Sequence, residues 1–462
     1  MRTLSRLLVG VVILGGVIGG GAYYLAGDAP GPTIDIERPA TAIGLESQLE
    51  MSIESPDGPL TRVEAYLVQT DQRFPLFSLD RPEGATLTQE SAERLRVARA
   101  FGRRTFPALN QGEAELVVTA ARPVLFGLRE AESTVRRELR LLFEPPRVQV
   151  LSTQHFVNHG GAEMAVYRVT PPEAESGVRV GDRMFPGYPA AGGGLTAADP
   201  STRIAFFALA YDQDLNTPIE VVGIDEARNV GRTPLEHRSF AKTFRRSRLS
   251  VSDDFFRRVV PPILDRTDEV SVDLTTADGH LQGYLAVNGE LRRINAETIA
   301  SFADQTDPSI LWDGPFRQLG NSQVESGFAD HRTYVYDGRE VDQQVHLGFD
   351  LASTAQTPIE AANRGRVLFA DYLGIYGNAV IVDHGMGVQS LYAHLSSIEV
   401  AVGQTVEQGA PLGRSGTTGL AGGDHLHFTM LVHGQPVNPV EWWDPHWLED
   451  RIFRKLEAVG GE

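Results

Sequence analysis

The segments His346-Leu-Gly-Phe-Asp350 and His425-Leu-His427 decide how this sequence is interpreted, because their polar residues recur at the spacing of a β-strand. In a strand, side chains at positions i, i+2 and i+4 point to the same face. His346 and Asp350 would therefore share one face of one strand, and His425 and His427 one face of another. The apolar residues between them would point to the opposite face. Together with Tyr392-Ala393-His394, these segments predict a sheet with a polar cleft on one side.

These side chains are of the types that bind zinc. Zinc in proteins prefers imidazole nitrogen and carboxylate oxygen, and a catalytic zinc site has three protein ligands and one open position for water. Four histidines and one aspartate can supply three ligands and leave two polar groups beside the metal. Residue type and spacing alone do not say which of the histidines bind. The sequence predicts one zinc ion per chain at the cleft.

The last third of the chain resembles the lysostaphin/LytM-type zinc endopeptidases, which cut peptides in bacterial peptidoglycan. The resemblance runs from about Ser326 to Pro439, and its blocks occur in the family's order and at similar spacing. The blocks are H-L-G-F-D-L-A (346–352), G-R-V-L-F-A (365–370), Y-G-N-A-V-I-V-D-H-G (376–385), L-Y-A-H-L-S (391–396), V-G-Q-T-V-E-Q-G-A-P-L-G (402–413), S-G-T-T-G (415–419), H-L-H-F (425–428) and V-N-P (437–439).

The resemblance implies a role for each of five residues. His346, Asp350 and His427 would bind the zinc ion, and His394 and His425 would flank the metal-bound water and the scissile carbonyl. A neutral histidine can accept the proton of the water, and a protonated one can stabilise the oxyanion or donate to the leaving amine. Which of the two histidines does which stays open. The family also implies an antiparallel β core whose sheet forms the floor of a groove.

The sequence departs from the family's pattern in three places. Asp424 and Thr429 stand where the family often has proline and glutamate around H-L-H-F. Neither position is a ligand in the family. We therefore expect a change in the pKa of nearby histidines or in the packing around the site, rather than loss of activity. The segment between Gly327 and His346 is longer and more polar than the family's lead-in, and we expect it to form a loop over the groove.

Composition excludes several classes of protein. The 462 residues are enough for roughly three domains. A formal net charge of −18 argues against a nucleic-acid partner. The chain has no cysteine, which excludes disulfides, thiolate metal sites, a cysteine nucleophile and a lipoprotein anchor.

The N-terminus predicts a location at the membrane. Arg2 and Arg6 precede an apolar run from Leu7 to about Ala26, and the next basic residue is Arg38. The run is long enough to span a bilayer, and the charge bias predicts a cytoplasmic N-terminus. We expect a single-pass inner-membrane protein with its body in the periplasm. The alternative is a cleaved signal peptide that leaves a secreted or periplasmic protein.

The rest of the chain is predicted to be mainly β with some α. Alternating segments such as Leu49–Ile53 and Val63–Val68 indicate β-sandwich-like domains, and Ser252 is placed as the N-cap of a helix. The predicted parts are a transmembrane anchor or signal segment (1–27), an immunoglobulin-like β domain (33–146), a second β domain (147–239), a mixed helical connector (240–310), a LytM-like antiparallel-β metallopeptidase domain (311–446) and a C-terminal helix (447–462).

Two functions fit these features. The first is a zinc endopeptidase that hydrolyses peptide cross-links of peptidoglycan from the periplasmic side, with stem peptides as substrate and the membrane contacted through the N-terminal helix. The alternative is a catalytically silent regulator of the same fold that binds and activates other cell-wall hydrolases. Such regulators typically lack ligand residues, whereas this chain keeps all five. Division or wall-synthesis proteins are candidate partners in either case.

Overall fold

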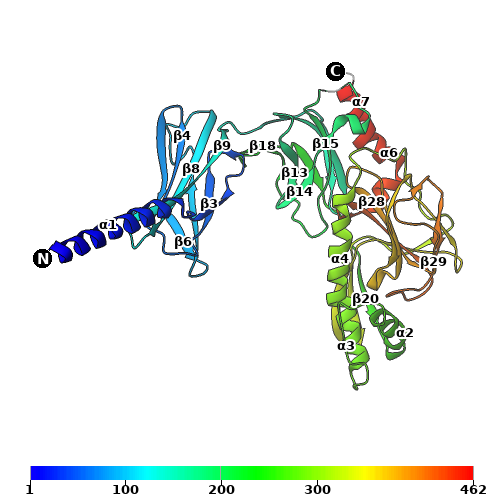
Figure 1. Ribbon diagram of the computed structural model, residues 1–462. Helices are drawn as coiled ribbons and strands as arrows, with labels where there is room; N and C mark the ends of the chain where they lie inside the picture. The colour runs from blue at the N-terminus through cyan, green and yellow to red at the C-terminus, as the bar shows by residue number, and fades with distance from the viewer. Residues whose placement is uncertain (1, 198, 461–462) are drawn as a thin grey trace. The chain divides into compact units, whose positions relative to one another are not determined.

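The computed structural model describes residues 2–197 and 199–460 (Figure 1). The chain is mainly β with some helix, it begins with an apolar helix, and it contains several sheets, as the sequence predicts. Its internal contacts divide it into two units. The first contains residues 1–146 and 224–231, and the second contains residues 147–223 and 232–462.

The first unit begins with the helix α1 (Arg2–Leu25) and the short helix η1 (Ala26–Asp28). The stretch from Gly10 to Asp28 is long and apolar enough to cross a membrane. Two sheets follow, with strand orders β1-β3-β7-β6 and β2-β9-β8-β4-β5. The strands are β1 (Thr33–Arg38), β2 (Ala42–Ile43), β3 (Ser47–Glu54), β4 (Arg62–Gln69), β5 (Gln72–Ser78), β6 (Ala85–Gln89), β7 (Arg94–Phe101), β8 (Gly112–Val124) and β9 (Arg129–Leu141).

The two sheets of the first unit share one hydrophobic core. The alternation of side chains along a strand explains how β3 contributes to this core. Leu49, Met51 and Ile53 lie at every second position of β3, and all three are fully buried. The segment 224–231 joins this unit through Asn229. The Asn229 side chain accepts a hydrogen bond from the backbone N–H of Leu45 (2.9 Å) and donates one to the carbonyl of Leu142 (2.8 Å).

The second unit begins with three small sheets, of orders β10-β12-β16-β15, β14-β13-β17-β18 and β11-β19. The strands are β10 (Arg147–Val150), β11 (His155–Asn158), β12 (Ala162–Thr170), β13 (Glu175–Val180), β14 (Arg183–Pro186), β15 (Tyr188–Pro189), β16 (Thr202–Ala208), β17 (Ile219–Ile224), β18 (Val230–Pro234) and β19 (His237–Phe240), with η2 (Ala190–Gly193) between β15 and β16. Apolar side chains of β12 and β16 continue into the core of the last third of the chain, where Phe206 packs against Trp442 with ring centroids 6.1 Å apart.

Helices follow, in the part of the chain that the sequence predicts to be a mixed helical connector. Ser252 caps the first of them, because its hydroxyl accepts a hydrogen bond from the backbone N–H of Phe255 (3.3 Å). The helices are α2 (Asp253–Leu264), α3 (Gly279–Ala286), η3 (Val287–Leu291), α4 (Arg292–Ser301) and η4 (Phe302–Gln305). The segments α3, η3 and α4 run on as one rod with a π-helical turn in the middle (Figure 1).

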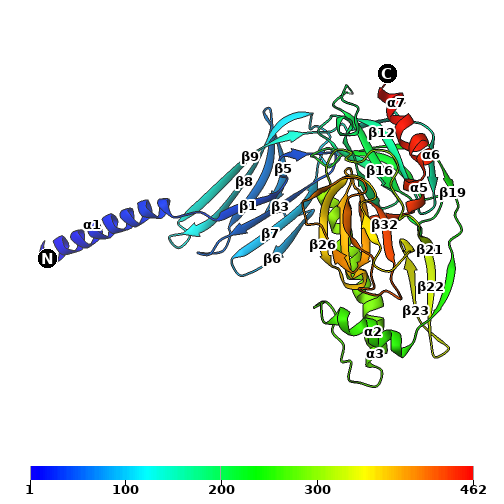
Figure 2. The same cartoon turned by 90° about the vertical axis from the view of Figure 1, so that its right-hand side faces the viewer.

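The C-terminal sheet has the order β21-β24-β32-β28-β27-β26-β30, and all of its pairs are antiparallel (Figure 2). Its strands are β21 (Gln323–Ser326), β24 (Phe349–Ala352), β26 (Gly365–Tyr372), β27 (Asn378–Asp383), β28 (Val388–Leu395), β30 (Thr405–Val406) and β32 (Leu426–Val432), with β33 (Gln435–Val437) paired to β32.

Two three-stranded sheets accompany the C-terminal sheet, with orders β20-β22-β23 and β25-β31-β29. Their strands are β20 (Arg246–Ser250), β22 (Asp330–Tyr336), β23 (Arg339–His346), β25 (Pro358–Glu360), β29 (Ser397–Ile398) and β31 (Pro411–Arg414). The remaining helices are η5 (Gly374–Tyr376), α5 (Pro439–Trp443), α6 (Pro445–Leu448), η6 (Glu449–Phe453) and α7 (Arg454–Gly460).

Candidate metal centre

Three adjacent strands bring the predicted site residues together. In the register of the C-terminal sheet, Asp350 of β24 is paired with His427 of β32, and His427 is paired on its other side with Ala393 of β28. His346 is the last residue of β23 and His425 directly precedes β32. All five predicted residues line one cavity of about 630 Å³, and each is buried.

The interpretation of His346 and Asp350 as two positions of one strand is wrong. His346 ends β23, Asp350 lies in β24, and Leu347 and Gly348 turn the chain between them. A spacing of four residues fits either arrangement, so the pattern could not distinguish them. The turn passes directly over the imidazole of His427, because a Cβ at Gly348 would lie 2.7 Å from the ring and 2.6 Å from Thr429 Oγ1.

Gly348→Ala is therefore expected to displace His427 and to weaken metal binding. The added methyl group has no room, so we also expect about 1–3 kcal/mol of destabilisation. Zinc content per chain and thermal unfolding measure the two effects. Gly422→Ala is the matched control, since Gly422 also lines the cavity and no atom lies within 4 Å of a Cβ there. Full zinc content in the Gly348 variant would contradict this account of the turn.

Three potential ligand atoms converge in the wall of the cavity. His346 Nε2 lies 2.9 Å from Asp350 Oδ1 and 2.9 Å from His427 Nδ1, and His427 Nδ1 lies 3.0 Å from Asp350 Oδ1. Together they form a group of buried side chains that could hold one metal ion. The donor set, two imidazole nitrogens and one carboxylate oxygen, suits zinc and leaves a fourth position for water.

Hydrogen bonds on the far side of each ring fix which nitrogen faces the centre. His346 Nδ1 lies 3.1 Å from the carbonyl of Gly327 and must donate to it, so Nε2 presents a lone pair. The Thr429 hydroxyl donates to the carbonyl of Leu347 (3.0 Å) and therefore accepts from His427 Nε2 (3.0 Å). His427 Nδ1 thus also presents a lone pair. Three electron-pair donors within about 3 Å of one another are arranged so that one cation could bind all of them.

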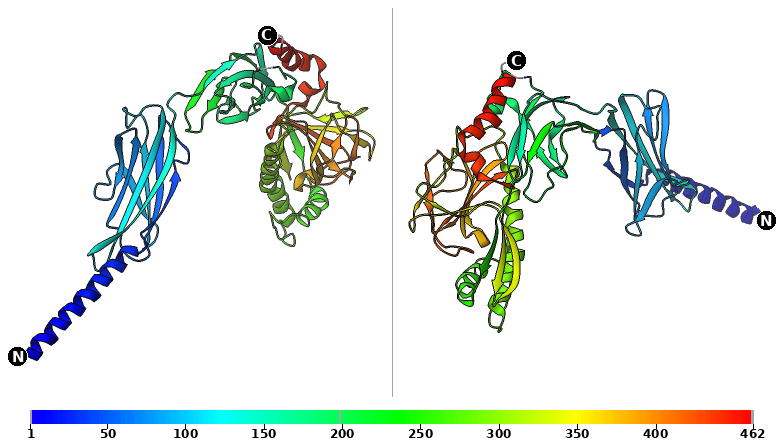
Figure 3. Two further views of the ribbon diagram at one scale, coloured as in Figure 1. Left: turned by 45° about the horizontal axis from the view of Figure 1, so that its top comes forward. Right: turned by 180° about the vertical axis from the view of Figure 1, so that it is seen from behind.

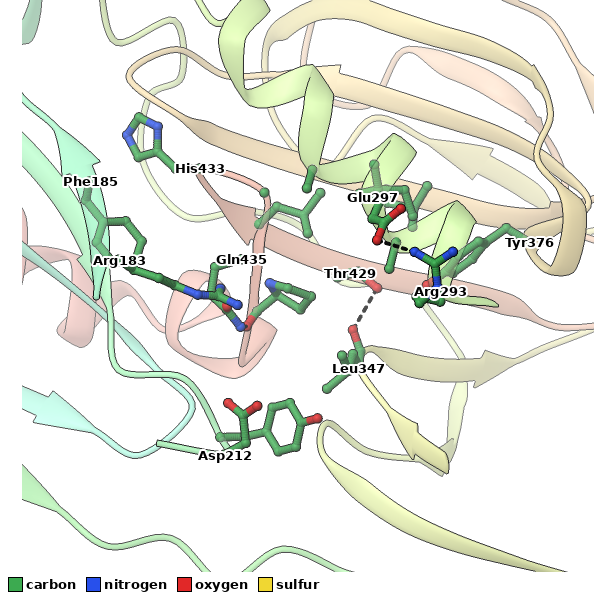
Figure 4. Close-up of a pocket in the computed structure, with 18 of the residues that line it drawn as sticks. Arg183, Phe185, Asp212, Arg293, Glu297, Leu347, Tyr376, Thr429, His433 and Gln435 are labelled. Carbon is green, nitrogen blue, oxygen red and sulfur yellow. Dashed lines mark hydrogen bonds and ion pairs between the residues drawn. The ribbon is translucent and has the colours of Figure 1, made fainter. Parts of the chain in front are cut away.

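Thr429 also lies in the wall of a second cavity, which is farther along the same face of β32, because Thr429 is two residues from His427 in that strand. This cavity has a volume of about 500 Å³, and Figure 4 shows Thr429 and Leu347 in its wall with their hydrogen bond drawn. In the sequence, Thr429 stands out only as a departure from the family's pattern. Its contacts show what it does: the hydroxyl selects the tautomer of His427.

Thr429→Val keeps the shape of the side chain but removes this hydroxyl. We expect zinc affinity to fall by about 10–100-fold, the usual effect of losing a hydrogen-bond partner of a metal ligand. Competition with a chelator of known affinity measures it. Thr429→Ser restores the hydroxyl and should bind zinc as the native chain does. Equal affinities of the Val and native proteins would refute the tautomer assignment.

Arg332 of β22 holds the carboxylate of Asp350. Its guanidinium donates to Asp350 Oδ2 (2.8 Å) and leaves Oδ1 toward the two histidines. The carboxylate of Asp330 lies 3.7 Å from the same guanidinium, and it accepts a hydrogen bond from the Ser247 hydroxyl (2.8 Å). Sequence reasoning missed Arg332, because it lies in a strand without a motif. The expected loop between Gly327 and His346 is instead the hairpin β22–β23, which places Arg332 and Tyr334 in the wall of the cavity.

A bulge in β28 aims His394 into the cavity. Asn378 pairs with Leu395 and Val380 with Tyr392, so two residues of β28 stand opposite one of β27. His394 also has a positive φ of 63°, a strained conformation for a residue other than glycine. Its Nδ1 donates to the carbonyl of Thr418 (2.8 Å), which leaves Nε2 free for chemistry.

His425 is held in the same manner as His394. Its Nδ1 donates to the carbonyl of Gly423 (2.8 Å), its Nε2 lies 3.5 Å from Asp350 Oδ1, and its ring centroid lies 4.8 Å from that of His394. Both histidines therefore present Nε2 beside the group of three ligands. Position alone does not assign the roles of proton acceptor and proton donor between them.

Burial and charge set the protonation of these groups. Burial alone raises the pKa of Asp350, but His346, His425 and His427 together hold it well below its usual value. Burial lowers the pKa of His427 to about 4 and that of His394 well below its usual value, so both are neutral at pH 7. Burial also lowers the pKa of His425, but Asp350 outweighs it and the net shift is upward.

Two imidazoles and a carboxylate that converge in the wall of a cavity beside an antiparallel sheet form a possible metal-binding site. Residues 344–439 match the model of peptidase family M23, so the chain carries an M23 peptidase domain in its C-terminal region. This match includes all three converging residues and both flanking histidines.

Curated relatives match about a fifth of the chain. The DD-carboxypeptidase/endopeptidase Mpg of Neisseria meningitidis serogroup B is 44% identical over 97 residues, which cover 21% of this chain and 22% of that protein. The murein hydrolase activator EnvC of Escherichia coli is 39% identical over 95 residues, which cover 21% of this chain and 23% of that protein. The match thus spans less than a quarter of either relative.

Among solved structures, the catalytic domain of the antimicrobial peptidase lysostaphin from Staphylococcus simulans matches 28% of this chain and 96% of its own length. The identity is 25% and the TM-score is 0.24.

Proposed function

We propose that this protein is a zinc-dependent endopeptidase that hydrolyses peptide cross-links of bacterial peptidoglycan. The M23 match and the relative described as a DD-carboxypeptidase/endopeptidase support a peptidase acting on the cell wall. The observation that carries the zinc assignment is the convergence of three buried lone pairs, on His346, Asp350 and His427, within 2.9–3.0 Å of one another.

In this proposal His346 Nε2, His427 Nδ1 and Asp350 Oδ1 hold the metal. A zinc ion bound there supplies a Lewis acid and lowers the pKa of a coordinated water toward neutrality. Arg332, Thr429 and the carbonyl of Gly327 keep the three ligand atoms aimed at one point. This preorganisation lets the site bind one ion without rearranging its side chains.

His394 and His425 move the protons of hydrolysis. Each has its Nδ1–H bound to a backbone carbonyl, so each offers only Nε2 to the substrate. One Nε2 takes the proton of the attacking water, and a protonated Nε2 stabilises the oxyanion or gives a proton to the leaving amine.

The walls of the cavity suit an anionic peptide. Arg245, Arg258 and Arg292 line it together with Tyr284 and Tyr334. Arg258 donates to the carbonyl of Gly422 (3.0 Å) and Arg292 to the side-chain oxygen of Asn288 (2.6 Å), and both acceptors are neutral. Each guanidinium can therefore take a carboxylate of a stem peptide as a further partner.

We further propose that α1 anchors the protein in the inner membrane, with the body in the periplasm. The apolar stretch Gly10–Asp28 supports either an anchor or a signal sequence, and the wall substrate requires the body to be exported. The mass of the protein extracted from membranes distinguishes the two, because cleavage after the apolar stretch would remove it.

Digestion of purified sacculi tests the enzymatic proposal. The full chain is incubated with sacculi, and the products are resolved by mass spectrometry. We expect cross-linked dimers to be converted to monomers, the reaction to stop when zinc is removed by a chelator, and zinc to restore it. Unchanged muropeptides at every zinc concentration would overturn the proposal.

A second candidate function is regulation of other wall hydrolases, and the similarity to the activator EnvC favours it. A regulator would give the opposite result in the sacculus digestion. The chain alone would leave sacculi intact, and it would accelerate digestion by a separate hydrolase with or without zinc. The complete ligand set of this chain favours the enzyme.

A further inference from the structure

The turn between β8 and β9 exposes large apolar side chains. Its sequence is Leu125-Phe126-Gly127-Leu128, and the side chains of Phe126 and Leu128 are 104% and 71% exposed. Leu125 and Phe126 also have positive φ angles, 50° and 58°, in a turn where asparagine or glycine is favoured. Leu125 is half-buried, but the side chains of Phe126 and Leu128 are exposed in the described part of this chain, so a contact outside it would account for them.

This turn lies beside the end of the apolar helix α1 (Figures 2 and 3). Arg129, the first residue of β9, donates to the carbonyl of Tyr23 (2.7 Å), and its guanidinium stands 4.7 Å from the centre of the Tyr23 ring. Arg122, near the end of β8, donates to the carbonyl of Pro30 (2.9 Å). Arg129 therefore ties the start of β9 to the last turn of α1, and Arg122 ties β8 to the segment that follows η1, so the turn lies close to the end of α1.

We propose that the β8–β9 turn inserts into the periplasmic face of the lipid bilayer that α1 crosses. This inference rests on the proposed anchor. The occupant is a lipid surface because the turn continues the exposed apolar surface of α1, where Tyr24 and Leu25 are 77% and 70% exposed. Tyrosine is enriched at the membrane–water interface, so Tyr23 and Tyr24 mark the depth at which Phe126 would enter.

The charges next to the turn are compatible with a membrane surface. Glu130 and Glu132 of β9 are the nearest acidic residues along the strand, and both pair with Arg62 of β4 at 3.3 and 2.5 Å. Arg62 offsets one of these two negative charges, and Arg129 at the start of β9 offsets the other, so this stretch carries no net negative charge toward the lipid headgroups. The insertion would hold this end of the first unit on the membrane at two points, α1 and the turn.

Because the chain has no cysteine, single cysteines place a spin label at chosen sites in the full protein. The sites are Phe126→Cys at the turn, Gly16→Cys in α1, where a side chain meets nothing within 4 Å, and Asp71→Cys between β4 and β5. The register of β4 with β8 puts Asp71 at the opposite end of the same sheet. Each labelled protein is reconstituted in vesicles of phosphatidylcholine and phosphatidylglycerol, and its accessibility to oxygen and to a water-soluble nickel chelate is measured.

We expect the labels at 16 and 126 to be accessible to oxygen and protected from nickel, and the label at 71 to be accessible to nickel. If the label at 126 is as accessible to nickel as the label at 71, while the label at 16 is protected by lipid, the inference is overturned. The anchor is then still supported. A label at 16 in water overturns the anchor and, with it, the inference. Dipolar broadening at 126 would show two copies meeting through the turn and would also overturn it.

The label itself is apolar, so a second variant tests whether the native side chain drives insertion. A label at Leu128→Cys is compared in chains that carry Phe126 or Phe126→Ser. We expect the protection from nickel at 128 to fall when Phe126 is replaced. Equal protection in both chains would mean that Phe126 does not insert.

Discussion

The Asp350→Asn variant is expected to bind no zinc and to lose on the order of 10³-fold or more of its rate of cross-link hydrolysis. The amide oxygen of asparagine can keep the hydrogen bond from Arg332, which now reaches Asp350 Oδ2 at 2.8 Å. The amide N–H₂ would then point to His346 Nε2 and His427 Nδ1, which are 2.9 and 3.0 Å from Asp350 Oδ1. Two donated protons would satisfy both lone pairs, so the site would be complete without a cation.

This variant should therefore stay folded and lose only its metal. Zinc analysis, muropeptide digestion and thermal unfolding with and without added zinc measure the three properties. The native protein should unfold at a higher temperature when zinc is added, because a ligand that binds only the folded state stabilises it, and the variant should not respond. Asp371→Asn, exposed on β26 of the same sheet, is the matched control. One zinc ion per chain in the Asp350 variant would refute the assignment of the ligand.

Lys455→Met is expected to destabilise the second unit by about 3–5 kcal/mol. Lys455 lies in α7, and its ammonium donates to Glu163 Oε1 (2.5 Å) and to the carbonyl of Met164 (3.1 Å), both in β12. Glu163 is fully buried and Lys455 is only 5% exposed. Removing the lysine leaves a buried carboxylate without its cation, and this loss costs more than the pair itself contributes.

A double replacement separates the cost of leaving Glu163 unpaired from the loss of the ion pair itself. In Lys455→Met/Glu163→Gln the buried charge is gone as well, so we expect part of the lost stability to return. Urea unfolding followed by the tryptophan fluorescence of the second unit measures both variants, since all of Trp312, Trp442, Trp443 and Trp447 belong to that unit. A single variant as stable as the native chain, or a double variant less stable than the single one, would contradict the account.

Local signals were sufficient for several features. The apolar run near the N-terminus predicts the helix α1, because hydropathy over one segment needs no partner. Ser252 predicts the start of α2, because a cap depends on residues three positions away. Alternation predicts that β3 packs one face into a core. Each of these depends on interactions between neighbours in sequence.

The site shows where such signals fail. The spacing of His346 and Asp350 suggested one strand, yet Gly348 turns the chain between two strands. The contacts of Arg332 with Asp350 and of Thr429 with His427 and Leu347 depend on how strands from separate parts of the chain are paired. The exposed turn at Phe126 was also missed, since its position beside Tyr23 comes from contacts across more than one hundred residues.

The sequence by itself determined which side chains are candidates for the centre, because the types and order of His346, Asp350, His394, His425 and His427 can be identified without a fold. Only the tertiary structure decided which atoms face one another. Strand register places Asp350 opposite His427, a bulge redirects His394, and distant acceptors select each imidazole tautomer. Hydrogen bonds act over about 3 Å between specific atoms, so their partners become defined only when the chain has folded.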